Sequence, residues 1–238
     1  MHGKQMVAAI VERYAEFGDG GYELSDELLR VANDLDLETR AEFEQSLLDR
    51  VISKRGNYGA ALWALGHFAG PHTAEAISGK LDEELRKVPT DRYWVFGLFE
   101  SLIDLKYRGI VERAAAFVDQ EAVVGRFDAL CVLGDLVRVS TDEFIRLSVK
   151  WTGRLLTTSG TQPVEQLLRP ITFALSAANP IVATKIISGV AQQSSEAADA
   201  FRTILLLNLK DIARTMPRRR DAAQQVIDVL GDIDNIDH

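Results

Sequence analysis

Hydrophobic residues recur along this chain with the spacing of one helix face. Val7, Ile10, Val11, Tyr14 and Phe17 follow an i, i+3, i+4, i+7 pattern, and the same period of about 3.6 residues continues through most of the chain. Runs of Val, Ile and Thr bounded by hairpin turns are missing. The pattern therefore predicts an all-α protein of about a dozen helices joined by short loops.

Helix breakers and capping residues predict where the first helices begin and end. The Gly-Asp-Gly-Gly run at 18–21 is expected to end the first helix, and Ser25 is expected to open a short second one. Arg55 and Gly56 are expected to close a third helix, which contains Phe43.

Later helix starts are expected where a side chain can accept a hydrogen bond from an orphan backbone N–H. Thr90, Thr141 and Ser194 stand in such places. Pro170 lies inside a periodic stretch and predicts either a kink or a helix start. No linker rich in Ser and Gly divides the chain, so we predict one domain over residues 1–238.

A 34-residue repeat organises the middle of the chain. The segments 61–69, 95–103 and 129–137 align at this constant offset, and a second apolar helix follows each. The aligned large apolar residues are Leu62, Phe96 and Leu130; Leu65, Phe99 and Leu133; and Phe68, Leu102 and Leu136. We predict that Leu65, Phe99 and Leu133 are buried, because a helical hairpin needs a stacked neighbour to cover its apolar face.

The first of these units resembles the HEAT-like helical repeat family. Ala60-Ala61-Leu62-Trp63-Ala64-Leu65-Gly66 is followed by Gly70-Pro71 and then by Ala74, Ala76 and Ile77. The third unit keeps Leu133-Gly134 without the turn proline, and the middle unit has Glu100 in place of the glycine. The likeness is good over residues 57–155 and extends to the flanks only as helical pairs. It implies a right-handed α-solenoid with atypical end pairs and a concave surface for another macromolecule.

Composition excludes several classes of protein. Of the 238 residues 47% are hydrophobic and 26% are charged, and Cys131 is the single cysteine. One thiol cannot form an intrachain disulfide or a multi-thiolate zinc site. No run approaches the ~18 apolar residues of a membrane span, and the first residues lack a secretory hydrophobic region. We therefore expect a cytoplasmic protein that does not contact membranes and needs no cofactor.

The charge is negative and unevenly distributed. The formal net charge is −8, and the segment 12–49 holds twelve acidic residues against three arginines. This balance disfavours nucleic acid as the partner. The acidic segment is either a set of solvated helix faces or a surface that steers a basic partner.

A basic stripe is one candidate partner-binding surface. Arg146, Lys150 and Arg154 stand at i, i+4 and i+8, within an arc of about 80° on one predicted helix, and Arg113 could extend the stripe. The alternative is an ordinary exposed face on which Glu143 partly neutralises Arg146.

An aromatic cluster is the second candidate surface. Arg92, Tyr93 and Trp94 combine two aromatic rings with an arginine, which is a common composition of interface anchors. The repeat places Ala60 and Asp128 at the position of Trp94, so it does not require a large ring there. The alternative is that Trp94 packs within its own helix face.

These observations predict a non-enzymatic scaffold or adaptor that binds a protein, such as an inhibitor or chaperone of a basic partner. No catalytic or metal-ligating spacing surrounds His67 or His72. The oligomeric state and the choice between the two surfaces stay open.

Two other functions remain open as alternatives. One is DNA repair, since the chain is similar in length and repeat to HEAT-like alkylpurine DNA glycosylases. The nearest analogues of that family's site residues would be Trp94, Trp151, Asp91 and the basic stripe. The other is a helper role in small-molecule chemistry such as chromophore attachment, which some HEAT-like repeat proteins perform.

Overall fold

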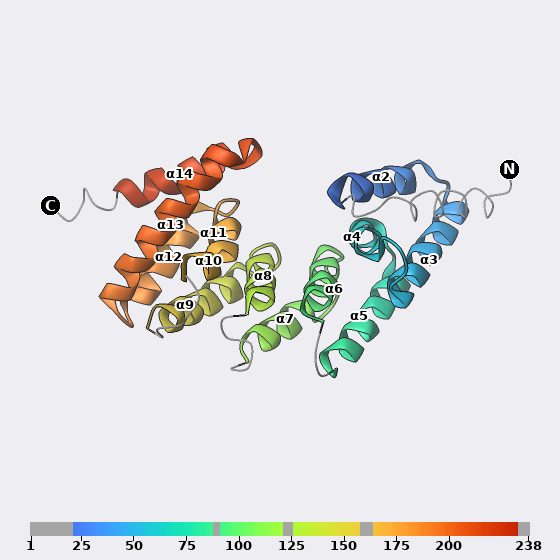
Figure 1. The fold of residues 1–238 in the computed structure, drawn as a ribbon, viewed down its shortest axis with the longest axis horizontal. Coiled ribbons are helices and arrows are strands. Elements are labelled where there is room, and N and C mark those ends of the chain that lie inside the picture. The colour runs from blue at the N-terminus through green and yellow to red at the C-terminus, as the bar shows by residue number, and fades with distance from the viewer. Residues whose placement is uncertain (1–20, 88–90, 121–125, 158–163, 233–238) are drawn as a thin grey trace. The chain divides into compact units, whose positions relative to one another are not determined.

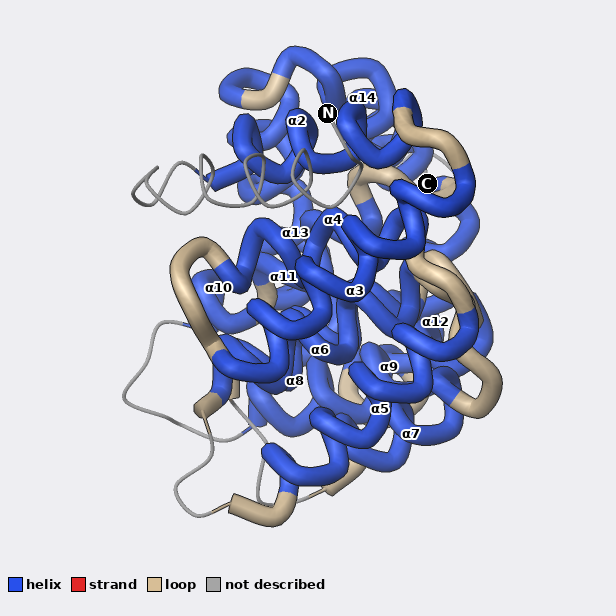
Figure 2. The backbone as a smooth tube through the Cα atoms, turned by 90° about the vertical axis from the view of Figure 1, so that its right-hand side faces the viewer, coloured by secondary structure: helices blue, strands red, loops and turns tan. Residues whose placement is uncertain are grey.

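The computed structural model describes residues 21–87, 91–120, 126–157 and 164–232. Within these ranges the chain forms helices joined by loops, without a β-strand (Figure 2). This confirms the predicted all-α class. The chain divides into two compact units, 1–110 and 111–238. The expectation of a single domain stays a prediction.

Unit 1 is built of helices that alternate between two layers. Its described helices are α2 (Gly21–Asp34), α3 (Leu37–Ser53), α4 (Tyr58–Phe68), α5 (Pro71–Leu85) and α6 (Arg92–Asp104) (Figure 1). Helix α4 packs against both α2 and α6, which gives one layer. Helices α3 and α5 contact each other and form the second layer, packed on α4 and α6 respectively.

Unit 2 begins with the same alternation and then departs from it. Its described helices are α7 (Ile110–Val118), α8 (Phe127–Leu136), α9 (Thr141–Thr157), α10 (Val164–Leu167), α11 (Arg169–Leu175), α12 (Pro180–Ala191), α13 (Ser195–Thr215) and α14 (Arg220–Asp232), with a 3₁₀ turn at Pro217–Arg219. Helix α8 packs on α11, and α9 packs on α12. The long α13 contacts α9, α11, α12 and α14, so it touches helices of both layers.

The burial pattern follows the predicted repeat. Leu65 on α4, Phe99 on α6 and Leu133 on α8 are each 0% exposed, which confirms their predicted burial. Leu62 and Leu130 are also buried, whereas Phe96 is only half-buried. Phe96 lies at the edge of the face that Phe99 and its neighbours bury, so the repeat register does not guarantee full burial at every aligned position.

A glycine lies at a close approach of two helices in each unit. A Cβ added at Gly66 on α4 would lie 3.1 Å from Ser101 Cα on α6. A Cβ added at Gly134 on α8 would lie 3.1 Å from the carbonyl oxygen of Pro170 on α11. Beside Gly66, the Ser101 hydroxyl donates to the carbonyl oxygen of Leu62 at 3.0 Å. The Leu-Gly pair of the repeat therefore has a packing role: the missing side chain lets backbones of the same layer approach each other.

Several predicted helix boundaries are confirmed. Helix α3 ends at Ser53, one residue before Lys54, whose positive φ of 51° terminates the helix close to the expected place. The Ser194 hydroxyl accepts from Ala197 N–H at 3.2 Å and caps α13. Pro170 lies in the first turn of α11, so of the two predicted roles it takes that of a helix start.

Other boundaries differ from the expectation. Helix α2 begins at Gly21, four residues before Ser25, so Gly21 belongs to a helix and not to a loop. Thr141 is the first residue of α9, and the capping hydroxyl is that of Ser140, which accepts from Glu143 N–H at 3.4 Å. A cap stands one residue outside the helix, and a Ser-Thr pair does not reveal from sequence which hydroxyl takes that place.

Two expectations involve residues outside the described ranges. The helix predicted over 7–17, with the loop residues 18–20 that were to end it, lies there, as does Thr90. Asp91, which was expected inside the first turn of the helix that Thr90 would cap, is instead the N-cap of α6 and accepts from Trp94 N–H at 3.2 Å.

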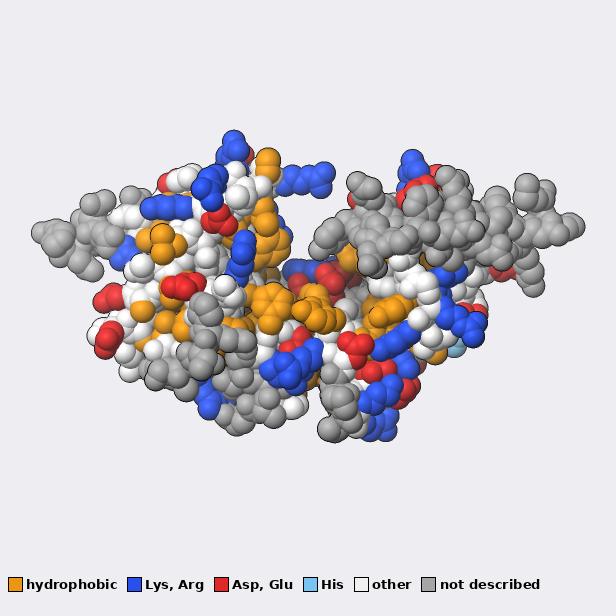
Figure 3. All heavy atoms as spheres, viewed as in Figure 1, with side chains coloured by type: hydrophobic (Ala, Val, Ile, Leu, Met, Phe, Trp, Pro, Cys, Tyr) orange, Lys and Arg blue, Asp and Glu red, His pale blue; other side chains and the backbone are white. Residues whose placement is uncertain are grey.

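The outer surface of α5 is a mixed charged face. Figure 3 shows basic and acidic side chains interspersed over this helix. Lys80 Nζ lies 3.0 Å from Glu83 and 3.5 Å from Glu84, and Lys87 Nζ lies 2.7 Å from Glu84. These pairs follow the i, i+3 and i, i+4 spacing of neighbours on one helix face and leave little uncompensated charge there.

Candidate functional site

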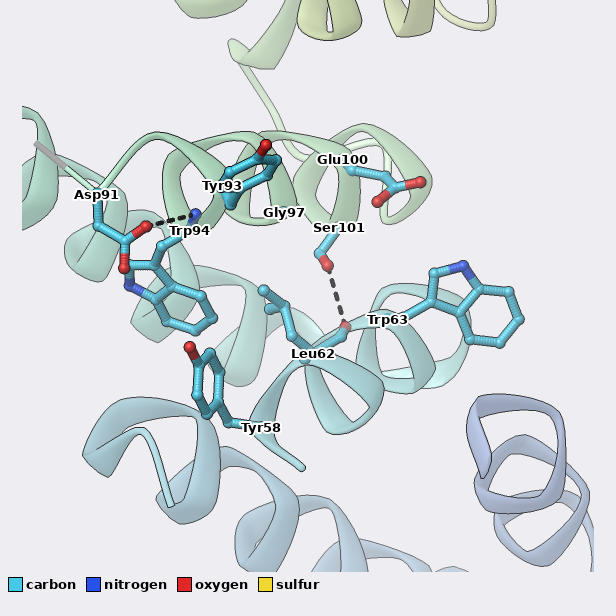
Figure 4. Close-up of a pocket in the computed structure, with 10 residues that line it drawn as sticks. Tyr58, Leu62, Trp63, Asp91, Tyr93, Trp94, Gly97, Glu100 and Ser101 are labelled. Atoms are coloured by element: carbon cyan, nitrogen blue, oxygen red, sulfur yellow. Dashed lines mark hydrogen bonds between the residues drawn. The ribbon is translucent and has the colours of Figure 1, made fainter. Parts of the chain in front are cut away.

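A groove of about 210 Å³ lies between α4 and α6 of unit 1 (Figure 4). Its lining comes from the two helices and the N-cap of α6: Tyr58, Gly59, Leu62, Trp63, Asp91, Tyr93, Trp94, Gly97, Glu100 and Ser101. Four of these residues are aromatic and two carry carboxylates. The groove includes two of the three residues of the predicted aromatic cluster.

The groove has a buried floor and an exposed aromatic rim. Leu62, Trp94 and Ser101 are 3%, 4% and 2% exposed and form the floor, whereas Tyr93 is 81% exposed. Gly97 contributes no side chain, and a Cβ added there would meet only Leu62 Cδ2 within 4 Å, at 3.4 Å. The absent side chain at Gly97 keeps the middle of the groove open.

Trp94 is fixed at one end of the groove by contacts with two other helical segments. Its ring meets the edge of Tyr58 in a T-shaped pair with centroids 5.1 Å apart. Lys54 Nζ lies 4.9 Å from the centroid of the Trp94 ring and 3.0 Å from Asp91 Oδ2. Partial burial would raise the pKa of Asp91, but the hydrogen bonds from Lys54 and from the Trp94 N–H outweigh it and lower that pKa.

The structure distinguishes the members of the predicted aromatic cluster. Arg92 and Tyr93 are exposed, whereas Trp94 is buried against Tyr58 and Lys54. The buried Trp94 Nε1 has no hydrogen-bond partner among the described residues. Solvent therefore reaches Tyr93 and not Trp94, and the partner-binding role of the cluster stays a prediction.

The predicted basic stripe in unit 2 is matched by carboxylates. Arg146 Nη2 lies 2.8 Å from Glu143 Oε2, as the i, i+3 spacing indicated. Lys150 Nζ lies 2.6 Å from Asp119 Oδ1, and Arg146 Nη1 lies 3.8 Å from Asp119 Oδ2. Arg113 and Arg154 are half-buried, and each has an interaction partner of its own. The stripe is therefore not an uncompensated positive surface.

The ion cluster borders a second hollow, of about 360 Å³, between α7 and α9. The hydrogen bond from Lys150 holds the pKa of Asp119 below its ordinary value, with a smaller contribution from Arg146. The hydrogen bonds that Arg146 donates to Glu143 in turn raise the pKa of Arg146. Asp119 was not foreseen from the sequence, because it stands 31 residues before Lys150 and follows a different helix.

Replacing Asp119 by Asn should reduce stability at neutral pH and leave it unchanged in acid. The Asp119 pKa is lower in the folded than in the unfolded state, so its contribution is present above about pH 4 and is lost as the pH falls through the folded pKa. Both side chains of the Asp119–Lys150 pair are more than one third exposed, so solvent screening limits the effect to less than about 1 kcal/mol.

Urea denaturation from pH 3 to pH 7 measures this difference. Asp199→Asn, at an exposed position on α13, is the charge-matched control. The assignment of a stabilising Asp119–Lys150 pair would be contradicted if the difference in free energy of unfolding between Asp119→Asn and the unmodified protein grew larger as the pH fell.

Residues proposed as analogues of a DNA glycosylase site have structural roles here. Trp151 is 1% exposed, and its Nε1 donates to the carbonyl oxygen of Val118 at 3.2 Å. Trp94 is buried, and Asp91 caps α6 while it pairs with Lys54. None of the three therefore presents an unoccupied reactive group to a nucleic acid.

The remaining candidates for chemistry were His67 and Cys131. His67 lies in the last turn of α4, with its ring centroid 4.0 Å from that of Trp63. Cys131 is half-buried. In the part of the chain that the structure describes, no group of three His, Cys, Asp or Glu side chains is arranged to hold a metal ion. None of the helices in that part is long and apolar enough to cross a membrane.

No protein-family model, curated protein or solved structure matches this chain. The resemblance to HEAT-like repeats therefore depends on the motif residues alone, and the structure supports it only as far as helices packed against their neighbours.

Sequence reasoning missed Trp63 and Tyr58 as parts of the groove. A signal was present in the repeat: the position held by Trp63 on α4 is held by Gly97 on α6, 34 residues later. Gly97 has no side chain to fill the space over Leu62, which the groove occupies. Reading the repeat for differences in side-chain volume would have pointed to this groove.

Proposed function

We propose that this protein is a non-enzymatic scaffold that binds another protein, and that its helices form a right-handed α-solenoid of HEAT-like hairpins. The alternation of α2, α4 and α6 with α3 and α5 supports the solenoid, as does the pairing of α8 with α11 and α9 with α12. The two close approaches at Gly66 and Gly134 occupy the same position of the repeat and support it further.

The exposed ring of Tyr93 above the α4–α6 groove is the observation that carries the binding role. A tyrosine 81% exposed loses contact with water only when something covers it, and its large, rigid ring costs little conformational entropy to bury. The groove beside it is concave and lined mainly by aromatic and apolar residues, as binding sites are. The cytoplasmic location remains part of the proposal. The burial of Trp94 and Trp151 and the pairing of the basic stripe with carboxylates disfavour the DNA-repair alternative.

Site-specific photo-crosslinking tests this function. A benzoylphenylalanine at position 93 replaces one aromatic ring by another, and the same substitution at Phe127, 51% exposed at the start of α8, is the matched control. In extract of the source cells we expect a discrete adduct with one protein at position 93, at least about fivefold stronger than at position 127, since buried aromatic anchors concentrate near the centre of an interface.

Excess unmodified protein should compete the adduct away, and Tyr93→Ala should compete less well. Equal adduct patterns at positions 93 and 127, or no adduct at either, would count against binding through this groove.

A further inference from the structure

The connection between α13 and α14 in unit 2 is strongly basic. Residues 210–221 contain five basic and two acidic side chains, whereas the whole chain has a formal net charge of −8. Three of the five are the consecutive arginines 218–220, which lie at the end of the 3₁₀ turn and the start of α14. Figure 3 shows Lys and Arg side chains around the start of α14. This connection is therefore a positive region of an acidic protein.

Contacts with α11 hold the Arg219 side chain in one orientation. Its guanidinium carbon lies 3.7 Å from the centroid of the Phe173 ring. Its Nη1 donates to the carbonyl oxygen of Phe173 at 2.9 Å and to the hydroxyl of Ser176 at 3.1 Å. Because the planar group is already restrained, a guest that binds it would cost little further side-chain entropy.

One edge of the Arg219 guanidinium is still unused. Its Nε and Nη2 donate to no described residue, and the buried polar atoms of the described chain that lack a partner lie elsewhere. Both groups therefore face solvent. Two parallel N–H bonds from one guanidinium match the two oxygens of a carboxylate. Arg219 thus presents a bidentate donor edge at the surface.

No carboxylate of the described residues pairs with Arg218 or Arg219. The carboxylate of Asp211 lies 2.9 Å from Arg214 and 3.5 Å from Arg169, so it is already shared by two other arginines. Burial lowers the pKa of Arg219, and no acidic side chain offsets that effect. The guanidinium still carries its charge, because arginine is not deprotonated in proteins.

Arg126 of the same unit has the partner that Arg219 lacks. Its guanidinium lies 5.9 Å from the centroid of the Phe117 ring and pairs with the buried carboxylate of Asp128. Arg219 lies closer to its own ring, that of Phe173, but without a carboxylate beside it. A carboxylate at the open edge of Arg219 would complete the same arrangement of ring, guanidinium and anion.

We infer that Arg219 and Arg218 form a docking site for an acidic segment of a partner protein, with one carboxylate of that segment on the Nε–Nη2 edge of Arg219. Arg218 is exposed and adds attraction for a second carboxylate. The positive region steers an acidic segment toward this part of unit 2 before contact is made. Nucleic acid is disfavoured as the guest by the net charge of −8. The site is separate from the α4–α6 groove and does not depend on binding there.

Proton–nitrogen NMR of the full-length protein tests the inference. The reporter is the Nε–H signal of Arg219, which is assigned by its loss in Arg219→Lys. The probe is the peptide acetyl-Gly-Glu-Glu-Gly-amide at about pH 6, where glutamate is ionised, and the Gln-Gln and Lys-Lys analogues are the controls. We expect a saturable shift with the Glu-Glu peptide alone, at about millimolar affinity because so small a contact must offset the entropy of association.

Arg219→Lys tests whether the planar fork is needed. It keeps the charge but removes the bidentate edge, so it should weaken the Glu-Glu peptide about three- to fivefold, as followed by the backbone amide signals of residues 218–221. Arg214→Lys is the matched control in the same region. Its guanidinium already pairs with Asp211, so the affinity should change by less than about twofold.

Arg218→Gln tests the contribution of charge alone. It should weaken the peptide about two- to threefold at low salt and little at high salt, where exposed charges are screened. Arg55→Gln, at an exposed position of unit 1, changes the net charge equally and should have no effect. Circular dichroism checks that each variant folds.

The inference is overturned if the Arg219 signal does not shift, if the Gln-Gln peptide shifts it equally, or if Arg219→Lys binds as well as the unmodified protein. A stronger response to inorganic phosphate than to the Glu-Glu peptide would assign the site to a phosphate group instead. If removal of residues 233–238, which include Asp234 and Asp237, markedly tightened the peptide, the site would serve the chain's own end and not a partner. None of these outcomes bears on crosslinking at position 93, which probes unit 1.

Discussion

Replacing Phe99 by Ala is expected to lower the free energy of unfolding by about 3 to 5 kcal/mol. The Phe99 side chain is 0% exposed and stands at the centre of the apolar face of α6, so truncation removes buried area and leaves a cavity in a closely packed layer. Urea or guanidinium denaturation followed by circular dichroism gives the value. Leu65→Ala and Leu133→Ala, at the aligned positions of α4 and α8, should each cost about 2 to 5 kcal/mol for the same reason.

Phe96→Ala on the same helix is the matched control for Phe99→Ala. Phe96 has the same side chain but is half-buried, so its truncation should cost clearly less than that of Phe99. A loss near about 0.5 kcal/mol for Phe99→Ala, or equal losses at the two positions, would show that the repeat register is misassigned.

Gly66→Ala is expected to destabilise the protein by about 1 to 2 kcal/mol although alanine is the better helix former. Helix propensity alone would favour alanine by about 1 kcal/mol. The new Cβ would lie 3.1 Å from Ser101 Cα, a backbone atom that cannot rotate away, and overpacking of this kind costs about 1 to 3 kcal/mol. Gly134→Ala should behave alike, because its Cβ would meet the Pro170 carbonyl oxygen at 3.1 Å.

Gly97→Ala, in the same unit, is expected to stabilise the protein and not to destabilise it. Its Cβ would meet only a flexible leucine methyl at 3.4 Å, so the helix propensity gain of up to about 1 kcal/mol should remain. Thermal denaturation of the variants gives the order. If Gly66→Ala proved as stabilising as Gly97→Ala, α4 and α6 would not approach each other as closely as described.

The sequence predicted best those features that depend on local spacing. The period of the apolar residues and the 34-residue offset located the helices and the buried set of Leu65, Phe99 and Leu133, because both patterns reflect one repeated packing environment. The caps at Ser140 and Asp91 were each missed by one residue, since neighbouring polar side chains compete for the same orphan N–H groups.

Features that depend on contacts between distant segments were beyond the sequence pattern. Asp119, which follows α7, pairs with Lys150 on α9 beside the hollow between these helices, and nothing in the spacing of either helix reveals the pair. Trp94 and Asp128 occupy the same repeat position and are both buried, the first against Tyr58 and the second in an ion pair with Arg126. The repeat position holds an indole in one unit and a carboxylate in the next. Its environment depends on the side chains that pack against it in each unit, so the repeat pattern does not predict its burial.

Lys54 stands at a position with two requirements that favour different amino acids. Its backbone adopts the left-handed conformation in which glycine is the least strained residue, and its ammonium group is the cation that Asp91 and Trp94 share. Glycine would relax the chain where α3 ends but leave the first turn of α6 without its tether. Selection at position 54 therefore faces a trade-off between an unstrained backbone at the end of α3 and a Trp94 ring held in place. Substitution of Lys54 is expected to shift the Trp94 end of the groove.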